Sequence, residues 1–179
     1  MGRFTQGFYG YAFALFVCLA AVGLFLLVTP QSGEQHVPRV NYSIDQANAV
    51  RAASYPIEAP RQVPPNWVPN SSSVTQDGST VTWRLGFATG KQMHALVAQS
   101  NEQPAAEFAN RMANTDKVTG SREINGTAWQ ERFRSDKNQR SLVQIQPTHA
   151  VVVTGSADWQ ELTDLAASLA PQPHAATAG

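Results

Sequence analysis

An uninterrupted hydrophobic stretch near the N-terminus constrains this chain more than any other feature. Residues 8–29 include 22 positions without a single charge. As an α-helix, a stretch of that length would span about 33 Å, which matches a hydrocarbon core of about 30 Å. Within lipid, every backbone amide must find its partner inside the segment, so the segment must be helical there. The sequence therefore predicts one transmembrane helix within residues 1–30.

A cleaved signal peptide is the alternative interpretation of this stretch. Signal peptides usually have an apolar region of about 7–15 residues followed by an A-x-A site, and this chain has neither feature. The residues before Cys18 are bulky, whereas a lipoprotein signal has small residues there. We therefore expect an uncleaved signal anchor in the cytoplasmic membrane. Arg3 precedes the stretch and Glu34 follows it, so the positive-inside rule places the N-terminus in the cytoplasm and the remaining chain outside it.

The rest of the chain has the length of one modest domain. We expect a linker over residues 31–42, an extracytoplasmic domain over 43–171 and a disordered tail over 172–179. Once Arg3 is set aside, 12 basic residues stand against 13 acidic ones, and no basic stripe is present. Nucleic-acid binding is therefore disfavoured. The single cysteine lies in the hydrophobic stretch, so the domain has no disulfide.

Local patterns predict the first half of the domain. A short helix over 44–53 should begin at a capping box formed by Ser43 and Gln46, and a proline-rich strap over 55–70 should be extended and anchored by Trp67. Asp77 and the glycine after it favour a type I′ turn between two strands. The alternating apolar residues of the following strand, up to position 88, indicate one buried face, and a third strand should reach about position 100.

The second half of the domain gives equally regular patterns. A helix is predicted over 104–113, followed by four strands with a hairpin turn at Asn125. The strand at 150–155 is apolar throughout, as expected of a central strand covered on both faces. A second capping box, formed by Asp158 and Glu161, should begin the last helix. These elements predict an α+β domain, with helices packed on a mostly antiparallel sheet.

Several strings in this domain resemble one protein family. They are Tyr-Pro-Ile-Glu-Ala-Pro (55–60), Pro-Asn-Trp (65–67), Thr-Trp-Arg-Leu-Gly-Phe (82–87), Gln-Ser (99–100), Gly-Thr-Ala-Trp (126–129), Val-Val-Val-Thr-Gly-Ser-Ala (151–157) and the closing residues 161–169. Together they are similar to DUF4245, a family of actinobacterial membrane-anchored envelope proteins of unknown function. The resemblance implies an anchor and an envelope location, but no activity. Members often have glycine before the strap tryptophan, where this chain has Asn66. The topology is also similar to the PsbP/Mog1-like fold of accessory and binding proteins.

The sequence offers no convincing catalytic or metal-binding constellation. Its four histidines do not show the spacing of metal ligands, and Ser156 is better explained as a connector between a strand and a helix than as a nucleophile. We therefore expect no enzyme activity and no cofactor.

The residues that could contact a partner are few. Gly10, Ala14 and Cys18 recur at a spacing of four and could pack against another membrane helix, although small residues are common in such helices generally. Trp67 belongs either to the core or to a docking patch. Arg84, on the polar face of its strand, is either a surface contact or a solvated cation.

The sequence thus favours a non-enzymatic accessory or interaction protein of the bacterial cell envelope. Its partner would be an integral membrane protein complex beside the anchor. A binding module for a small envelope ligand, such as a lipid or a glycan, is the alternative.

Overall fold

The computed structural model describes residues 5–28 and 38–173, which fall into two compact units, Met1–His36 and Val37–Gly179. The tail beyond residue 173 and most of the predicted linker lie outside the described residues. Residue 40 of that linker already contacts the domain, because the Val40 N–H donates a hydrogen bond of 2.8 Å to the Pro69 carbonyl.

Helix α1 (Thr5–Val28) is the only element described in the first unit. Its side chains are described over residues 10–25, and they are exposed except at Gly23, which is half-buried. Within the described residues, no helix is both long and apolar enough to cross a membrane.

The second unit is built on a large antiparallel sheet, which confirms the predicted α+β class. Seven strands follow one another in the order β2-β3-β4-β8-β7-β6-β5, so β8 lies in the middle. This confirms the central position predicted for the apolar strand, whose residues Ala150 to Val153 are fully buried. The strands are β2 (Val68–Asp77), β3 (Thr80–Ala88), β4 (His94–Ser100), β5 (Val118–Ile124), β6 (Thr127–Arg134), β7 (Gln139–Ile145) and β8 (Ala150–Gly155).

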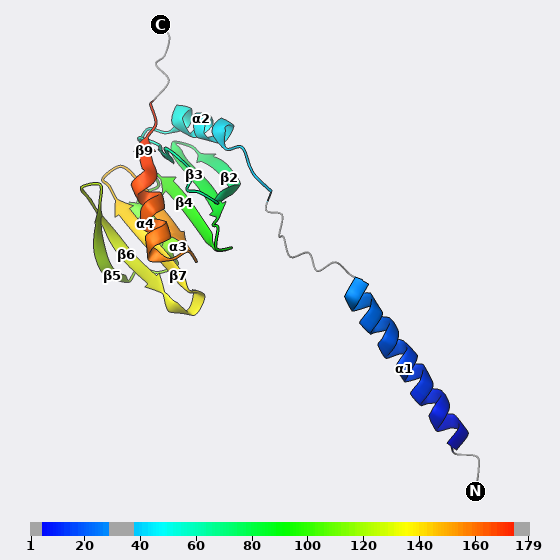
Figure 1. Ribbon diagram of the computed structural model, residues 1–179. Helices are drawn as coiled ribbons and strands as arrows, with labels where there is room; N and C mark the ends of the chain where they lie inside the picture. The colour runs from blue at the N-terminus through cyan, green and yellow to red at the C-terminus, as the bar shows by residue number, and fades with distance from the viewer. Residues whose placement is uncertain (1–4, 29–37, 174–179) are drawn as a thin grey trace. The chain divides into compact units, whose positions relative to one another are not determined.

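Helices cover both faces of this sheet (Figure 1). Helices α2 (Ser43–Ala52) and α4 (Trp159–Ser168) lie on one face, over a core that includes Trp83 and the other large side chains of β3. Helix α3 (Ala105–Ala113) lies on the other face, where Phe108 is buried among small residues of the central strands. A short 3-10 helix, η1 (Ser135–Lys137), joins β6 to β7.

One of the two predicted capping boxes is present and the other is absent. Asp158 accepts a hydrogen bond from the Glu161 amide at 2.9 Å, and the Glu161 carboxylate accepts one from the Asp158 amide. At α2 the prediction is wrong, because the residue before the helix is Tyr42, whose side chain makes no cap. The Ser43 amide donates instead to the Asn41 side chain at 3.1 Å, so Ser43 is the first residue of the helix and not its cap.

The two tight hairpins differ in turn type. In the β5–β6 hairpin, Asn125 and Gly126 both have positive φ values of 51° and 75°, as a type I′ turn requires. In the β2–β3 hairpin Asp77 pairs with Thr80, so the turn residues are Gly78 and the serine after it. Among the described residues of that turn only Gly78 has positive φ, which corrects the predicted type I′ turn to the pattern of type II′.

The proline-rich strap contains no helix, as predicted, but a turn at Pro65 and Asn66 interrupts its extended course. It also contains a strand that the sequence patterns missed. Strand β1 (Glu58–Pro60) pairs with β9 (Leu169–Pro171) in a separate two-stranded sheet. Trp67 anchors the strap in the core with 6% of its surface exposed, and its ring lies 5.9 Å from that of Phe87. Asn66 has a φ of 64°, which lies in the left-handed region that favours glycine and tolerates asparagine.

Candidate functional site

A hollow opens on the sheet face that carries α3. We call it the α3-side hollow, and its volume is about 330 Å³. It brings together side chains from β3, β4, α3, β7 and β8. The residues that line it are Arg84, His94, Leu96, Arg111, Met112, Asn114, Gln139, Thr154 and Gly155.

The register of the central strands explains why these side chains share one face. Arg84 of β3 stands opposite Ala98 of β4, and Leu96 of β4 stands opposite Thr154 of β8. Since alternate residues of a strand point to the same face, His94 and Leu96 lie on the side of Ala98. Ala98 packs against α3, so the whole row faces that helix.

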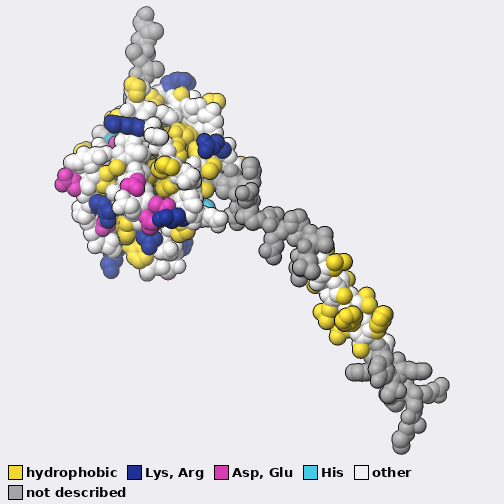
Figure 2. All heavy atoms as spheres, in the orientation of Figure 1, with side chains coloured by type: hydrophobic (Ala, Val, Ile, Leu, Met, Phe, Trp, Pro, Cys, Tyr) yellow, Lys and Arg dark blue, Asp and Glu magenta, His cyan; other side chains and the backbone are white. Residues whose placement is uncertain are grey.

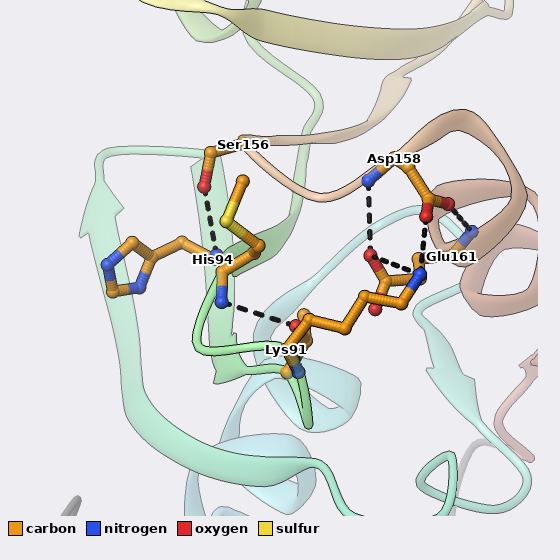
Figure 3. Close-up of polar contacts among 7 residues, drawn as sticks. Lys91, His94, Ser156, Asp158 and Glu161 are labelled. Atoms are coloured by element: carbon orange, nitrogen blue, oxygen red, sulfur yellow. Dashed lines mark hydrogen bonds and ion pairs between the residues drawn. The ribbon is translucent and has the colours of Figure 1, made fainter. Parts of the chain in front are cut away.

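The backbone of His94 is hydrogen-bonded at the junction between β8 and α4, and its side chain points away from that junction (Figure 3). The His94 N–H donates to the Ser156 hydroxyl at 3.0 Å, and its carbonyl accepts from the Ala157 amide at 3.1 Å. Ser156 therefore acts as a connector between β8 and α4, as predicted. In Figure 3 the imidazole points away from this junction, and it is free to border the α3-side hollow.

Of the two arginines that line the hollow, Arg111 is paired with a carboxylate and Arg84 is not. The Arg111 guanidinium donates two hydrogen bonds, of 2.7 and 2.6 Å, to the Glu102 carboxylate. These bonds hold the pKa of Glu102 below its ordinary value. Arg84 is exposed and makes no hydrogen bond or ion pair with any described residue; it acts on Glu102 only at longer range. Its guanidinium is therefore available to an anionic group from outside.

A second charged cluster ties the β3–β4 connection to the start of α4. Lys91 forms an ion pair of 2.6 Å with Asp158, and Glu161 lies 3.9 Å from the same ammonium group (Figure 3). The hydrogen bond from Lys91 lowers the pKa of Asp158. Because Asp158 also caps α4, this cluster has a structural explanation.

The residues described contain no group of three metal-ligating side chains. Thr154 is the only hydroxyl residue among those that line the hollow, and its oxygen already accepts a hydrogen bond of 2.8 Å from Gln139. The hollow presents an exposed guanidinium, from Arg84, beside the apolar side chains of Leu96 and Met112. On the face shown in Figure 2, basic and acidic side chains are interspersed, without a broad basic patch.

Among the residues that the structure describes, His149 is the one buried histidine, and the sequence patterns did not indicate its burial. The β7–β8 turn leaves it 2% exposed, with its ring stacked 4.8 Å from that of Tyr55. Its Nδ1 lies 3.1 Å from the Thr148 hydroxyl, and its Nε2 has no partner among the described residues. Burial lowers the pKa of His149, because the charged imidazole loses contact with water.

His149 should therefore make the domain less stable in weak acid. The unfolded chain takes up a proton near pH 6.5, whereas the folded chain resists it. This part of the stability is complete above about pH 6.5 and is lost as the pH falls towards the lowered pKa, by at most about 1.4 kcal/mol per pH unit. We expect His149→Gln to flatten this slope in urea unfolding between about pH 7.5 and 5.5. Equal slopes in His149→Gln and the wild type would contradict the prediction.

The other predicted contact residues lie apart from the hollow. Trp67 is in the core on the opposite side of the sheet, so little of its surface remains for a partner. Gly10, Ala14 and Cys18 are exposed on α1, and their role in packing stays a prediction. Sequence reasoning found Arg84, but it missed His94 and Arg111 as its neighbours, because only the strand order brings the three together.

The fold and the hollow define a small α+β domain with a seven-stranded antiparallel sheet and a hollow beside one helix, with two arginines among its lining residues. The chain belongs to the family described as "Protein of unknown function (DUF4245)", whose profile matches residues 3–169. No curated protein shows significant sequence similarity to it.

One solved structure with partial likeness is the complex structure of Pseudomonas aeruginosa MucA/MucB. It aligns with 12% identity and a TM-score of 0.35, over 65% of this chain and 35% of that chain. The present chain thus spans about a third of the length of the chain it matches, and the low score carries no argument about fold or function. The likeness to the PsbP/Mog1-like fold stays a prediction.

Proposed function

We propose that this protein is a non-enzymatic accessory protein of the bacterial cell envelope, held in the cytoplasmic membrane by its N-terminal segment. Its domain binds a larger membrane protein complex through the α3-side hollow. The observation that carries the proposal is Arg84, an exposed guanidinium without a direct partner in the described chain, at the rim of a hollow whose lining contains no acidic residue.

The anchor part of the proposal is supported by the sequence. The 22 uncharged positions of residues 8–29 have the length of a hydrocarbon core, and the charges around them favour a cytoplasmic N-terminus. Gly10, Ala14 and Cys18 would allow close approach of a partner helix in the same membrane.

The docking part of the proposal is supported by the charge of the hollow. A guanidinium can bind a carboxylate through two parallel hydrogen bonds, which fixes orientation as well as charge. An isolated exposed pair contributes only about 0.2–1 kcal/mol. Contact with Leu96 and Met112, beside Arg84, would supply the apolar area that such a pair needs for useful affinity.

Co-purification from the native host tests the proposal. The tagged full chain, solubilised in mild detergent, should recover the same membrane complex in repeated preparations. Arg84→Glu replaces the cation with an anion and should reduce recovery about tenfold or more. Arg51→Glu, on the exposed surface of α2, is the matched control and should leave recovery unchanged. Recovery of the protein alone, or equal recovery with Arg84→Glu, would overturn the proposal.

A small envelope ligand is the second candidate, because the hollow is large enough for one. Its volume of about 330 Å³ lies at the lower end of the range of small-molecule sites. Mass spectrometry of the purified chain should then detect a lipid or glycan that is lost in Arg84→Glu and kept in Arg51→Glu. A preparation free of such a ligand would remove this candidate.

A further inference from the structure

The two edges of the large sheet are protected to different degrees. Edge strands expose backbone groups, and proteins usually blunt them with charges, prolines or bulges. Strand β5 has a register shift near Gly120 and carries Arg122 and Glu123. Strand β2 has Pro69 and a register shift at its start, but its next six residues, 71–76, contain no charge and no proline.

The hairpin register shows which backbone groups of β2 point outward. In a two-residue hairpin the closing pair, here Asp77 and Thr80, is hydrogen-bonded, and hydrogen-bonded and non-bonded pairs then alternate. The N–H and C=O groups of Ser72, Val74 and Gln76 therefore point away from β3. The Val81 amide agrees with this pattern, because it donates to Asn101 and not to β2.

These outward groups have no backbone partner among the described residues. The one backbone hydrogen bond made to this edge comes from Val40 and ends at the Pro69 carbonyl, before the open stretch begins. At about 3.3 Å per residue, residues 71–76 form an edge of about 20 Å that no other described strand pairs with. That length accommodates a strand of ordinary size.

Arg84 gives the β2 edge a preference for an added strand that carries a negative charge. Arg84 pairs with Ser73 across β2 and β3, so the two side chains lie on the same face of the sheet. A residue on an added strand opposite Ser73 would share that face, about 10 Å from the Arg84 backbone at the usual strand spacing. A glutamate and an arginine side chain together can bridge this gap, whereas a lysine there would be repelled.

We propose that β2 accepts an extended segment of a partner protein as an eighth strand, with an acidic residue on the Arg84 side. This inference shares Arg84 with the proposed function and adds a second contact surface to it. Binding of an extended peptide to a sheet edge takes its affinity from the backbone ladder and its selectivity from alternate side chains. Here the selectivity comes from Arg84.

NMR titration of the ¹⁵N-labelled full chain in detergent micelles tests the inference. The probe is a capped peptide of about nine residues, alternating valine and threonine with a central glutamate, and its matched partner has lysine instead. The glutamate peptide should shift the amide signals of Ser72, Val74 and Gln76, and bind at least about threefold tighter than the lysine peptide. Arg84→Glu should reverse this preference.

Proline variants test whether the peptide binds at the β2 edge or elsewhere on the surface. Gln76→Pro removes an outward N–H at an exposed position, where an edge strand tolerates proline, and should weaken the glutamate peptide about threefold or more. Ser121→Pro makes the corresponding change on the β5 edge and should have no effect.

Three results would overturn the inference: no shifts up to about 1 mM peptide, shifts confined to other elements, or equal binding by Gln76→Pro and the wild type. If co-purification of the membrane complex still depends on Arg84 in that case, the proposed function stands and the edge inference alone fails.

Discussion

Gly155→Ala should destabilise the domain by about 3 kcal/mol or more, because no side chain fits at this position. A Cβ atom there would overlap the His94 carbonyl oxygen and lie 2.9 Å from the Ala95 Cα. Both obstacles are backbone atoms of β4, which pairs directly with β8 at this point. Relief would require the two central strands to separate, and the edge of the α3-side hollow would move with them.

Unfolding of the full chain in detergent micelles, followed by tryptophan fluorescence in urea, measures this effect. Gly126→Ala is the matched control, because a Cβ at Gly126 meets nothing within 4 Å. Gly126→Ala should therefore lower the free energy of unfolding only by the strain of a positive φ, about 1–2 kcal/mol. A Gly155→Ala protein as stable as the control would show that β4 and β8 are not packed as described.

Gln99→Leu is the second substitution expected to have a large effect, of about 2–4 kcal/mol. Gln99 is fully buried in β4, and its amide forms two hydrogen bonds with the backbone of Glu58. The Glu58 N–H donates to it at 2.9 Å, and its own N–H donates to the Glu58 carbonyl at 2.7 Å. Leucine is similar in size but would leave both backbone groups of Glu58 without a partner.

The same fluorescence measurement tests this substitution, with Gln144→Leu as the control. Gln144 is half-buried on β7, so its replacement should change the free energy of unfolding by less than about 0.5 kcal/mol. Hydrogen exchange should show in addition that the amides of Glu58 and Ala59 lose protection in Gln99→Leu before the large sheet does. Intact protection there, or equal stability of the two variants, would mean that Gln99 does not hold the strap.

Local patterns were sufficient to predict the elements whose stability is local. The alternation in β3 and the capping box at Asp158 both depend on residues close in sequence, and both are confirmed. The paired strands β1 and β9 were missed, because their prolines argue against a strand and their partners are more than a hundred residues apart. The capping box at Ser43 was predicted wrongly, because the sequence pattern does not fix which residue stands just before the first helical one. The structure places Tyr42 at that cap position.

The candidate site was predictable only in part, for the same reason. Arg84 stands out in sequence as the cation on the polar face of an alternating strand, and the structure leaves it exposed. Its neighbours His94 and Arg111 come from other elements, and no short pattern relates them to Arg84. The burial of His149 depends on Tyr55, nearly a hundred residues earlier in the chain.

The position of β8 has a consequence for how the chain is made. Strands β2 to β4 and strands β5 to β7 form two groups that are joined in the sheet only through β8, which is the last of the seven to be synthesised. A nascent chain that ends before Ala150 therefore holds two separate half-sheets, each with an open inner edge. Such edges can pair with other chains, so a nascent chain stays prone to aggregation until β8 has left the ribosome and joined the two groups of strands.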